Sequence, residues 1–391
     1  FIRIIIMENT NLKCQKGSVE QYEDFLDFIN YVFGFNGSEN DFVKLLPKLY
    51  RKEKNPACKN YIITENKKIR AAVGAFDSEI VICDNKLLCR GIGNVAVHPY
   101  HRSKGYMKEC MNTALKDMIK DGIHFSALGG RRQRYNYFGF DKTGVMYTFT
   151  VNDDNMRHVL GSERTPVYKI KEIGKDSCEL NLISELINKQ NYITLRPKDE
   201  LFYIMKSWQA KVYCAYDKDR FAGYCILNNG KITEIHTADR SDFFGFVTSL
   251  YDSLSIHGLT VTLPDFEQSY IKDLCMFSEW VGISSPMMFN ILDYRAVIDA
   301  FLKLKNSYIS SPDGKLNLII NGYARRENLC ISSEQGNPTV KESSETATME
   351  LSHLEAMNLL FSPVCPLRNE LPPFARAWFP LPLWQYPADE V

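Results

Sequence analysis

The chain has 391 residues, of which 45% are hydrophobic and 24% charged, and its formal net charge is zero. This is the composition of a globular protein, and the length exceeds one ordinary core, so we expect two or three domains. The balanced charge creates no field that would attract nucleic acid, and no apolar stretch approaches the roughly 20 residues that span a bilayer, so we expect neither partner.

The eleven cysteines include no Cys-x-x-Cys pair, and most of them lie inside apolar runs such as AGYCIL. Buried free thiols of this kind are typical of a reducing compartment, which predicts a cytoplasmic protein. The seven histidines are scattered along the chain, so the sequence predicts no bound metal. The opening segment FIRIII is short and has no small-residue cleavage site after it, and we interpret it as a first strand, not a signal peptide.

Two helices are predicted near the start of the chain. Ser18 begins a capping-box pattern with Gln21, and apolar residues then recur at helical spacing, which predicts a helix that ends near Gly34. Residues 42–50 predict a second, short helix that is interrupted at Pro47.

Residues 61–97 change to alternating apolar segments with polar turns between them, which predicts an antiparallel meander whose last strand ends at Val97. Apolar residues from 107 to 118 then mark one face of a helix, and Gly122 ends it. The segment IHFSALGG follows as a strand. It must run parallel to the strand before the helix, so the sequence predicts a strand–helix–strand crossover after a meander.

A second unit begins near residue 151. Residues 211–238 again predict three strands joined by turns, and residues 241–254 predict a helix after them. The three strands echo residues 61–97 in order and spacing, although the residues themselves differ.

A third change comes near Pro286, where residues 287–305 predict a strand that runs into an amphipathic helix. Three short β segments follow, and then a helix for which Ser352 is the expected N-cap. The tail, residues 371–391, contains two Trp, two Phe and one Tyr, which a disordered tail would rarely carry. We therefore expect the tail to be packed on the rest of the protein.

The segment RSKGYM, residues 102–107, connects the last meander strand to the helix. The first amides of a helix have no intrahelical partner, and with the positive end of the helix dipole they form an anion site. Gly105 lets a ligand approach the backbone, and Arg102 and Lys104 add charge, so a pyrophosphate is the expected ligand. The alternative is a charged, solvated turn. Neither a Rossmann fingerprint nor a Walker loop is present.

This turn resembles the Arg/Gln-x-x-Gly-x-Gly/Ala signature of the GNAT superfamily of N-acetyltransferases, although Met107 departs from the usual small third residue. The segment Tyr135-x-x-Phe138-Gly139-Phe140 resembles a second motif of these transferases. The plan of the whole chain is similar to that of the Enhanced Intracellular Survival (Eis) acetyltransferases. The resemblance implies an α+β / α/β protein with tandem GNAT folds, whose mixed sheets are flanked by helices. The implied domains are a catalytic GNAT domain, a degenerate GNAT-like domain and a sterol-carrier-protein-like domain, over residues 1–150, 151–285 and 286–391.

The resemblance also implies an enzyme that transfers acetyl from acetyl-CoA directly to a primary amine. Its general acid would be Tyr135, with Tyr137 as the local competitor, and its general base would be the carboxylate of Val391. The alternatives are that both tyrosines are packing aromatics and that the terminus is frayed. His98 is a third candidate base, but His-Pro after a strand more often closes a turn. The residues implied to bind acetyl-CoA are Val95, Ala96, Val97, Arg102, Ser103, Lys104, Gly105, Tyr106 and Met107, with the Val97 amide as the expected donor to the acetyl carbonyl.

The acceptor is expected to be an aminoglycoside, a polyamine-like molecule or a lysine side chain, because Asp389 and Glu390 add negative charge near the terminus. Asp24, Phe33 and Glu390 are the candidate acceptor-binding residues. The resemblance implies a homo-oligomer, a hexamer or trimer. Two other functions stay open: an aminoacyl-transferase of the tandem-GNAT type, and a non-enzymatic lipid-binding scaffold.

Overall fold

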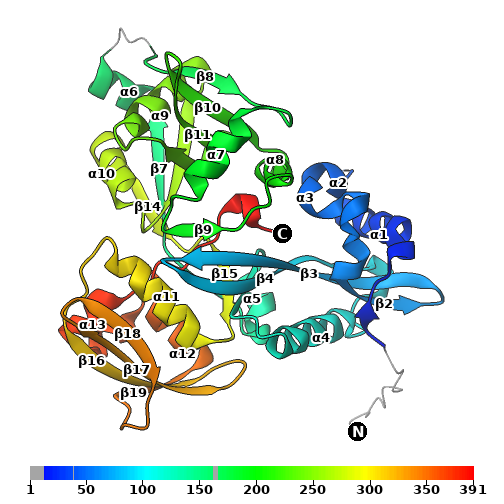
Figure 1. Cartoon of the computed structure of the whole chain (residues 1–391). Helices are drawn as coiled ribbons and strands as arrows, with labels where there is room; N and C mark the ends of the chain where they lie inside the picture. Colours follow the sequence, from blue (N-terminus) through cyan, green and yellow to red (C-terminus); the bar gives the residue numbers. More distant parts are fainter. Residues whose placement is uncertain (1–12, 38, 162–165) are drawn as a thin grey trace.

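The computed structural model describes residues 13–37, 39–161 and 166–391, and the expected strand FIRIII lies outside them. The described chain forms three β-sheets, each accompanied by helices (Figure 1). This mixed α/β architecture, with mixed sheets flanked by helices, confirms the predicted fold class.

The first sheet has the order β1-β2-β3-β4-β5-β15-β6, and β9 (Tyr192–Thr194) pairs with β3 at its side. Strand β3 runs without a break over 15 residues. Strands β4 and β5 are parallel, as predicted, and α4 (Tyr106–Lys120) connects them. The bounds of the other strands in the sheet order are β1 (Gln15–Lys16), β2 (Asn60–Glu65), β3 (Lys68–Ile82), β4 (Asn85–Val97), β5 (Phe125–Leu128), β6 (Asp141–Thr143) and β15 (Met287–Ile291).

Helices cover both faces of this sheet (Figure 1). Helix α4 packs on one face, and its apolar residues contact Tyr61, Val73 and Ile92 in one core cluster. Helices α1 (Tyr22–Gly34), α2 (Phe42–Leu45) and α3 (Pro47–Tyr50) lie on the opposite face, and α1 ends at the predicted glycine. The C-terminal residue lies on this second face (Figure 1).

The second sheet has the order β14-β7-β13-β12-β11-β10-β8. Its strands β10, β11 and β12 are antiparallel, and α9 then leads to β13, which is parallel to β12. This confirms the predicted repeat of the first unit's architecture. The bounds are β7 (Met146–Asn152), α6 (Asp153–Leu160), β8 (Lys169–Glu172), α7 (Glu179–Ile187), α8 (Leu201–Met205), β10 (Lys211–Asp217), β11 (Arg220–Asn228), β12 (Lys231–Thr237), α9 (Asp242–Ser253), β13 (Gly258–Pro264), α10 (Gln268–Phe277) and β14 (Val281–Ser284).

The third sheet, β18-β17-β16-β19, packs with α11 (Tyr294–Asn306), α12 (His353–Phe361) and α13 (Pro373–Trp378). Ser352 caps α12 as expected, and its capping box includes Glu355. The strands are β16 (Gly314–Asn321), β17 (Arg326–Glu334), β18 (Asn337–Glu342) and β19 (Met349–Ser352). Strand β18, NPTVKE, was not predicted, because its proline and charged residues obscure the pattern expected of a short edge strand.

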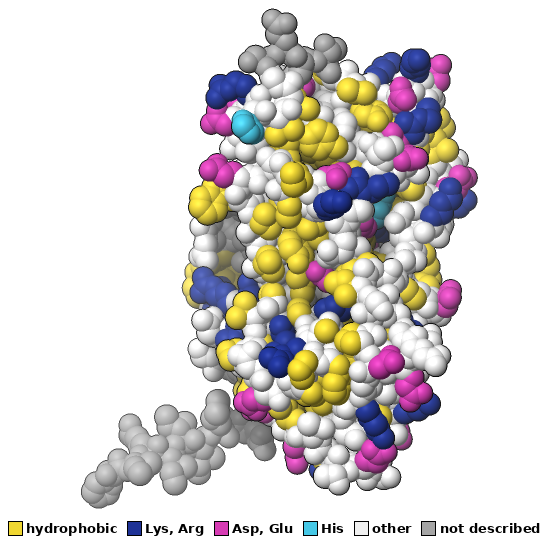
Figure 2. All heavy atoms as spheres, turned by 90° about the vertical axis from the view of Figure 1, so that its left-hand side faces the viewer, with side chains coloured by type: hydrophobic (Ala, Val, Ile, Leu, Met, Phe, Trp, Pro, Cys, Tyr) yellow, Lys and Arg dark blue, Asp and Glu magenta, His cyan; other side chains and the backbone are white. Residues whose placement is uncertain are grey.

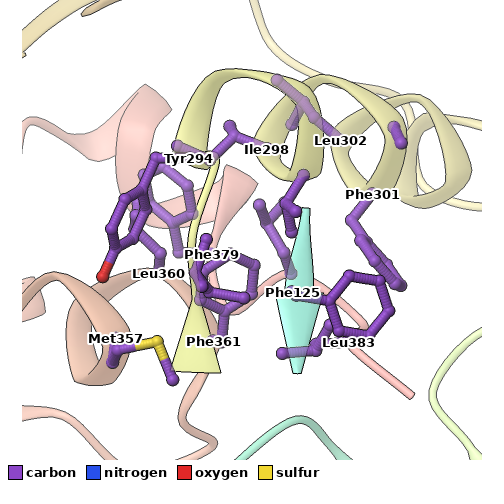
Figure 3. Close-up of a cluster of buried hydrophobic side chains, with 14 of the residues drawn as sticks. Phe125, Tyr294, Ile298, Phe301, Leu302, Met357, Leu360, Phe361, Phe379 and Leu383 are labelled. Carbon is purple, nitrogen blue, oxygen red and sulfur yellow. The ribbon is translucent and has the colours of Figure 1, made fainter. Parts of the chain in front are cut away.

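The tail is packed, as predicted, and it crosses the junction of the three sheets. Trp378 and Trp384 are each 1% exposed. Phe379 and Leu383 join the cluster around Phe125 of β5 and the apolar faces of α11 and α12 (Figure 3). The tail is thereby fixed on the way to its last residue.

The chain also crosses between the sheets before the tail begins. Strand β7 spans the expected boundary between residues 150 and 151, and its pairing lies within the second sheet. Strand β15 follows the expected boundary at residue 286, yet it pairs in the first sheet between β5 and β6. These crossings join the three parts through hydrogen-bonded strands.

Candidate active site

A β-bulge in β4 positions the site. The register between β3 and β4 shifts between the pairs Gly74↔Gly93 and Ala72↔Ala96, and Asn94 at this point has a φ of 38°. The Asn94 side chain is buried and accepts a hydrogen bond from the Tyr50 hydroxyl at 2.7 Å. It donates another to Asn60 Oδ1 at 2.7 Å. These bonds fix the bulge, a device that commonly re-aims side chains beside active sites.

The bulge changes the face of the sheet to which successive side chains of β4 point. Before it, Gly91 and Gly93 face the C-terminal residue. After it, Val95 and Val97 pack towards α4, whereas Ala96 joins the cluster on the α1 face. The pairing of β4 with β5 ends at Ile92↔Leu128, so the strand continues past its neighbour. One strand therefore borders a cavity on each face of the sheet at the place where two parallel strands separate.

The cavity on the α4 face has a volume of about 740 Å³ and runs along the start of α4. Its basic side chains come from the turn before α4, from α4 itself and from the segment after β5, and none of its described lining residues is acidic. We call it the anion groove. It is lined by Val32, Asn36, Val95, Val97, His101, Arg102, Ser103, Gly105, Tyr106, Met107, Lys108, Arg131, Arg134, Tyr137 and Phe138.

The backbone of the turn suits an anionic ligand. Ser103 and Gly105 have φ values of 64° and 80°, and a Cβ on Gly105 would meet nothing within 4 Å. The first backbone bond of the helix is donated by Glu109 to the Gly105 carbonyl. Among the described residues, no acceptor is found for the amides of residues 103–108. Free amides, a helix N-terminus and basic side chains together fit the diphosphate of an acyl-CoA.

Most of the predicted coenzyme-binding residues meet at this groove, but two do not line it. Ala96 points to the other face, and Lys104 Nζ lies 3.6 Å from a carboxylate oxygen of Glu65. The sequence analysis missed Lys108, Arg131 and Arg134. The run GGRRQR after the second parallel strand was the available signal for the two arginines.

The two tyrosines of the loop after β5 occupy different environments. Tyr135, the last residue of α5 (Arg132–Tyr135), is 6% exposed and packs among the residues below α4. Burial raises the pKa of its hydroxyl, so it stays protonated at neutral pH. Tyr137 is 66% exposed and lines the groove, with Lys108 Nζ 4.8 Å from its ring centroid.

On the opposite face, Val391 lies directly against β4. A Cβ added to Gly93 would come within 2.9 Å of the Val391 carbonyl carbon, and one added to Gly91 within 2.7 Å of its Cγ2. Because real Cβ atoms essentially never approach so closely, only glycine at these two positions admits the residue. Val391 also borders a second cavity of about 200 Å³, which we call the tail cavity.

Buried charges hold the tail in this position. The Arg196 guanidinium donates to both carboxylate oxygens of Asp389 at 2.9 Å and to both of Glu234, on β12 of the second sheet, at 2.7 Å. All three side chains are at most 4% exposed. Lys48 donates to the backbone oxygens of Ala388 and Glu390 at 2.6 Å each. The tail is therefore anchored to elements of both the first and the second sheet.

Burial also shifts the pKa values of ionisable groups beside the tail. Desolvation lowers the pKa of Lys48 to about 8 and raises that of the Glu390 carboxyl to about 7. The pKa of each group therefore lies away from its ordinary value, and perturbed pKa values of this kind are common near functional sites.

The other candidate residues lie away from both cavities. Asp24 is on the exposed face of α1, and Phe33 is 47% exposed and packs edge-on against Phe42. Neither lines the anion groove or the tail cavity. The Nδ1 atom of His98 accepts a bond from the Tyr100 amide at 3.4 Å, so this histidine closes the turn as the sequence favoured.

Comparisons with known proteins agree with this geometry. Residues 14–143 match the sequence profile of the family described as "Acetyltransferase (GNAT) domain". The chain carries a GNAT acetyltransferase domain. This domain assigns the protein to the acyltransferases, and the GNAT fold uses acyl-CoA. No curated protein matches the sequence.

Solved structures extend the likeness in fold to nearly the whole chain. A GCN5-related N-acetyltransferase from Kribbella flavida has a TM-score of 0.67 at 15% identity, covering 97% of this chain and 98% of that one. Eis1 from Mycobacterium abscessus has a TM-score of 0.64 at 12% identity, covering 96% and 98%. A probable N-acyltransferase from Enterococcus faecalis has a TM-score of 0.62 at 17% identity, covering 87% of each chain.

No helix within the described residues has the length and apolar character needed to cross a membrane. Within the same residues, no group of three or more His, Cys, Asp or Glu side chains is arranged to hold a metal ion.

Proposed function

We propose that this protein is an acetyl-CoA-dependent N-acetyltransferase that acetylates a primary amine directly. The observation that carries the proposal is the position of β4. The strand borders a basic groove with free amides on one face and Val391 on the other. A thioester held from the groove side at the end of β5 would face an amine that enters from the tail side.

The amides of residues 103–108 would hold the diphosphate, with Arg102, Arg131 and Arg134 around it. Bound acetyl-CoA supplies the thioester carbonyl that the amine attacks. The Val97 amide is the proposed donor to that carbonyl oxygen, where a hydrogen bond stabilises the charge that develops during attack.

Two residues have the proton-transfer roles. An alkyl ammonium has a pKa of about 10.4, so at neutral pH a base must remove a proton before the nitrogen attacks. The carboxylate of Val391 is the proposed base. Tyr135 is the proposed acid for the leaving thiolate: it is buried in the segment after β5, and its hydroxyl carries a proton at neutral pH.

The test is an acetyl-CoA consumption assay against a panel of amines. Deleting Val391, or extending the chain by Gly-Gly, should lower kcat about 10²-fold or more while acetyl-CoA binding is retained, the usual size of a general-base contribution. Tyr135→Phe should lower kcat by about 10²-fold. Tyr137→Phe removes the hydroxyl of the local competitor, which lines the groove, and a larger loss than that of Tyr135→Phe would give the acid role to Tyr137. Full activity of the extended chain would reject the terminal base.

Thermal protection distinguishes the other two functions. A ligand that binds the folded state raises the unfolding temperature. Acetyl-CoA should do so, whereas aminoacyl-tRNA and lipid should not. Protection by tRNA alone would favour an aminoacyl-transferase, and protection by lipid alone would favour a lipid-binding scaffold.

Three further features belong to the same proposal. The sheet of β16–β19 with its helices would be a sterol-carrier-protein-like domain, and the protein would act in the cytoplasm. It would also form a homo-oligomer, a hexamer or trimer. The observation that supports association is the apolar edge at β14, where Met276, Trp280, Val281 and Ile283 are 41–82% exposed. Figure 2 shows apolar side chains gathered along this side of the molecule. The mass of the protein in solution tests this part.

A further inference from the structure

The tail cavity is built from the two GNAT-like units and the tail. Its floor is formed by Gly91 and Val391, and Gln385 and Thr194 lie at its side. Its apolar wall comes from both units: Leu49, Phe76, Leu195, Pro197 and Ile204. The volume of about 200 Å³ is below the roughly 300–1,000 Å³ of pockets for drug-sized ligands.

Most charges at this cavity already have partners. Asp77 is paired with Arg90, and Glu200 is bonded by Arg51 and by Lys54 at 2.7 Å. Asp389 is held by Arg196, as described above. These carboxylates therefore present little free negative charge to a ligand.

Two acceptor groups at the cavity remain without a partner among the described residues. Gln385 is 2% exposed, and its Nε2 donates to the Asp389 carbonyl at 3.1 Å, but its Oε1 accepts no hydrogen bond. No ion pair is found for the Val391 carboxylate within the described part of the chain. A buried acceptor without a donor is costly, so this cavity is suited to a ligand that brings N–H groups.

We propose that the tail cavity is the acceptor site and that the acceptor is a compact amine with one cationic centre and an apolar body. This inference rests on the proposed acetyltransferase function and specifies its substrate class. A single ammonium satisfies both the Gln385 oxygen and the Val391 carboxylate, and the apolar wall covers the rest of the molecule. A polycationic acceptor would exceed the volume and find its further charges facing carboxylates that are already paired.

The reaction at this site balances without another reactant. The ammonium gives one proton to the Val391 carboxylate, the amine nitrogen forms a bond to the acetyl carbon, and the carbon–sulfur bond breaks. Of the two protons that remain on nitrogen, one stays as the amide N–H and the other is released. The thiolate takes up a proton from the acid, and the released proton restores the acid. The products are an acetamide and the free thiol of the coenzyme.

The experiment is steady-state kinetics with acetyl-CoA and five acceptors: 2-phenylethylamine, hexylamine, spermidine, kanamycin and a lysine-containing peptide. The two monoamines should have kcat/KM values at least about tenfold above those of the other three, since a snug apolar pocket discriminates by about that factor. A preference for spermidine, kanamycin or the peptide would overturn the inference and leave the acetyltransferase intact. Absence of both acetyl-CoA binding and turnover would instead overturn the proposed function.

Two variants locate the acceptor. Leu195→Trp changes a residue that is 44% exposed, so folding should be retained, and it narrows the cavity. Gln385→Met removes the unpartnered oxygen. Each should raise the KM of the monoamine about tenfold, with the acetyl-CoA KM unchanged. Ile309→Trp is the matched control, because Ile309 is 43% exposed and does not line the tail cavity. Unchanged monoamine KM in both cavity variants would place the acceptor elsewhere.

Discussion

The helices α4 and α9 each follow three antiparallel strands, in the first and in the second sheet, and so occupy equivalent places, but their N-termini differ in what they can bind. The turn before α4 is RSKG, and its amides have no acceptor among the described residues. The turn before α9 is ADRS, and its own carboxylates use the amides. Asp239 accepts from the Ser241 amide at 2.9 Å, and Asp242 from the Asp239 amide at 3.3 Å.

The same topology therefore gives a turn before α4 that can bind an anion and a turn before α9 whose amides are already bonded to its own carboxylates. Arg220 stabilises the ionised Asp242 and lowers the pKa of this carboxyl, so the negative charge at the start of α9 is fixed. A diphosphate would meet repulsion there. The comparison teaches that a site is created by the charge and backbone of the turn, not by the strand order.

The second unit instead supports the first through the tail. Glu234 of β12 and Arg196, which follows β9, together hold Asp389 two residues before Val391. Ala388 packs in the cluster between α7 and the second sheet. A unit whose turn is filled by its own carboxylates can thus still position a residue beside the first sheet.

The largest expected effect comes from breaking this support. Arg196→Met leaves the Glu234 and Asp389 carboxylates buried without their cation. Removing one partner of a buried ion pair costs about 3–5 kcal/mol, so unfolding should occur at a clearly lower denaturant concentration. Turnover should fall steeply because the tail is released, whereas acetyl-CoA should still bind, since the anion groove lies on the opposite face.

Arg220→Met is the control within the second unit, because it also breaks an arginine–carboxylate pair. The Arg220 side chain is 47% exposed, so the midpoint of unfolding should fall less than in Arg196→Met, and turnover should be retained. Equal effects of the two variants in denaturation and turnover would reject the supporting role.

A smaller effect is expected at the turn of the first unit. Gly105→Ala places a Cβ on a residue with a φ of 80°, which costs about 1–2 kcal/mol, so acetyl-CoA affinity should fall about tenfold as the turn shifts. Calorimetry with acetyl-CoA measures the change. Gly122→Ala, at the other end of α4 with a φ of 70°, carries the same strain but should bind normally. Similar affinities of the two variants would mean that the turn does not hold the coenzyme.

Much of the fold could be predicted because its signals are local. The capping box at Ser18, the stop at Gly34, the crossover through α4 and the echo at residues 211–238 all depend on nearby residues, and the structure has each of them. The packed tail was also predicted, because its aromatic content alone argued against disorder.

The parts that could not be predicted depend on contacts between distant segments. The insertion of β15 between β5 and β6 joins residues about 150 positions apart, and no local pattern encodes it. The bulge at Asn94 depends on Tyr50 and Asn60. The Arg196 anchor joins three segments, and nothing in the sequence distinguishes its three charged residues from the other charged residues beside them.

The smallest expected effect is a pH dependence at the tail. The pKa of Glu390 is raised to about 7, chiefly by desolvation and also by the Asp389 charge, while Lys48 and Lys231 act in the opposite direction. The folded state therefore binds more protons than the unfolded state between about pH 4.5 and 7, and stability falls as pH rises through this range. Glu390→Gln removes the titrating carboxyl and with it this loss of stability at higher pH.

The variant should gain stability over the wild type between pH 5 and pH 7.5, by on the order of 1 kcal/mol after allowance for solvent screening of a partly exposed residue. Chemical denaturation at the two pH values measures the gain. Glu39→Gln makes the same charge change at an exposed position, and its difference from the wild type should not grow with pH. If the stability difference between Glu390→Gln and the wild type is the same at both pH values, the Glu390 carboxyl is solvated in the folded protein. The end of the tail is then less tightly packed than its contacts with both units indicate.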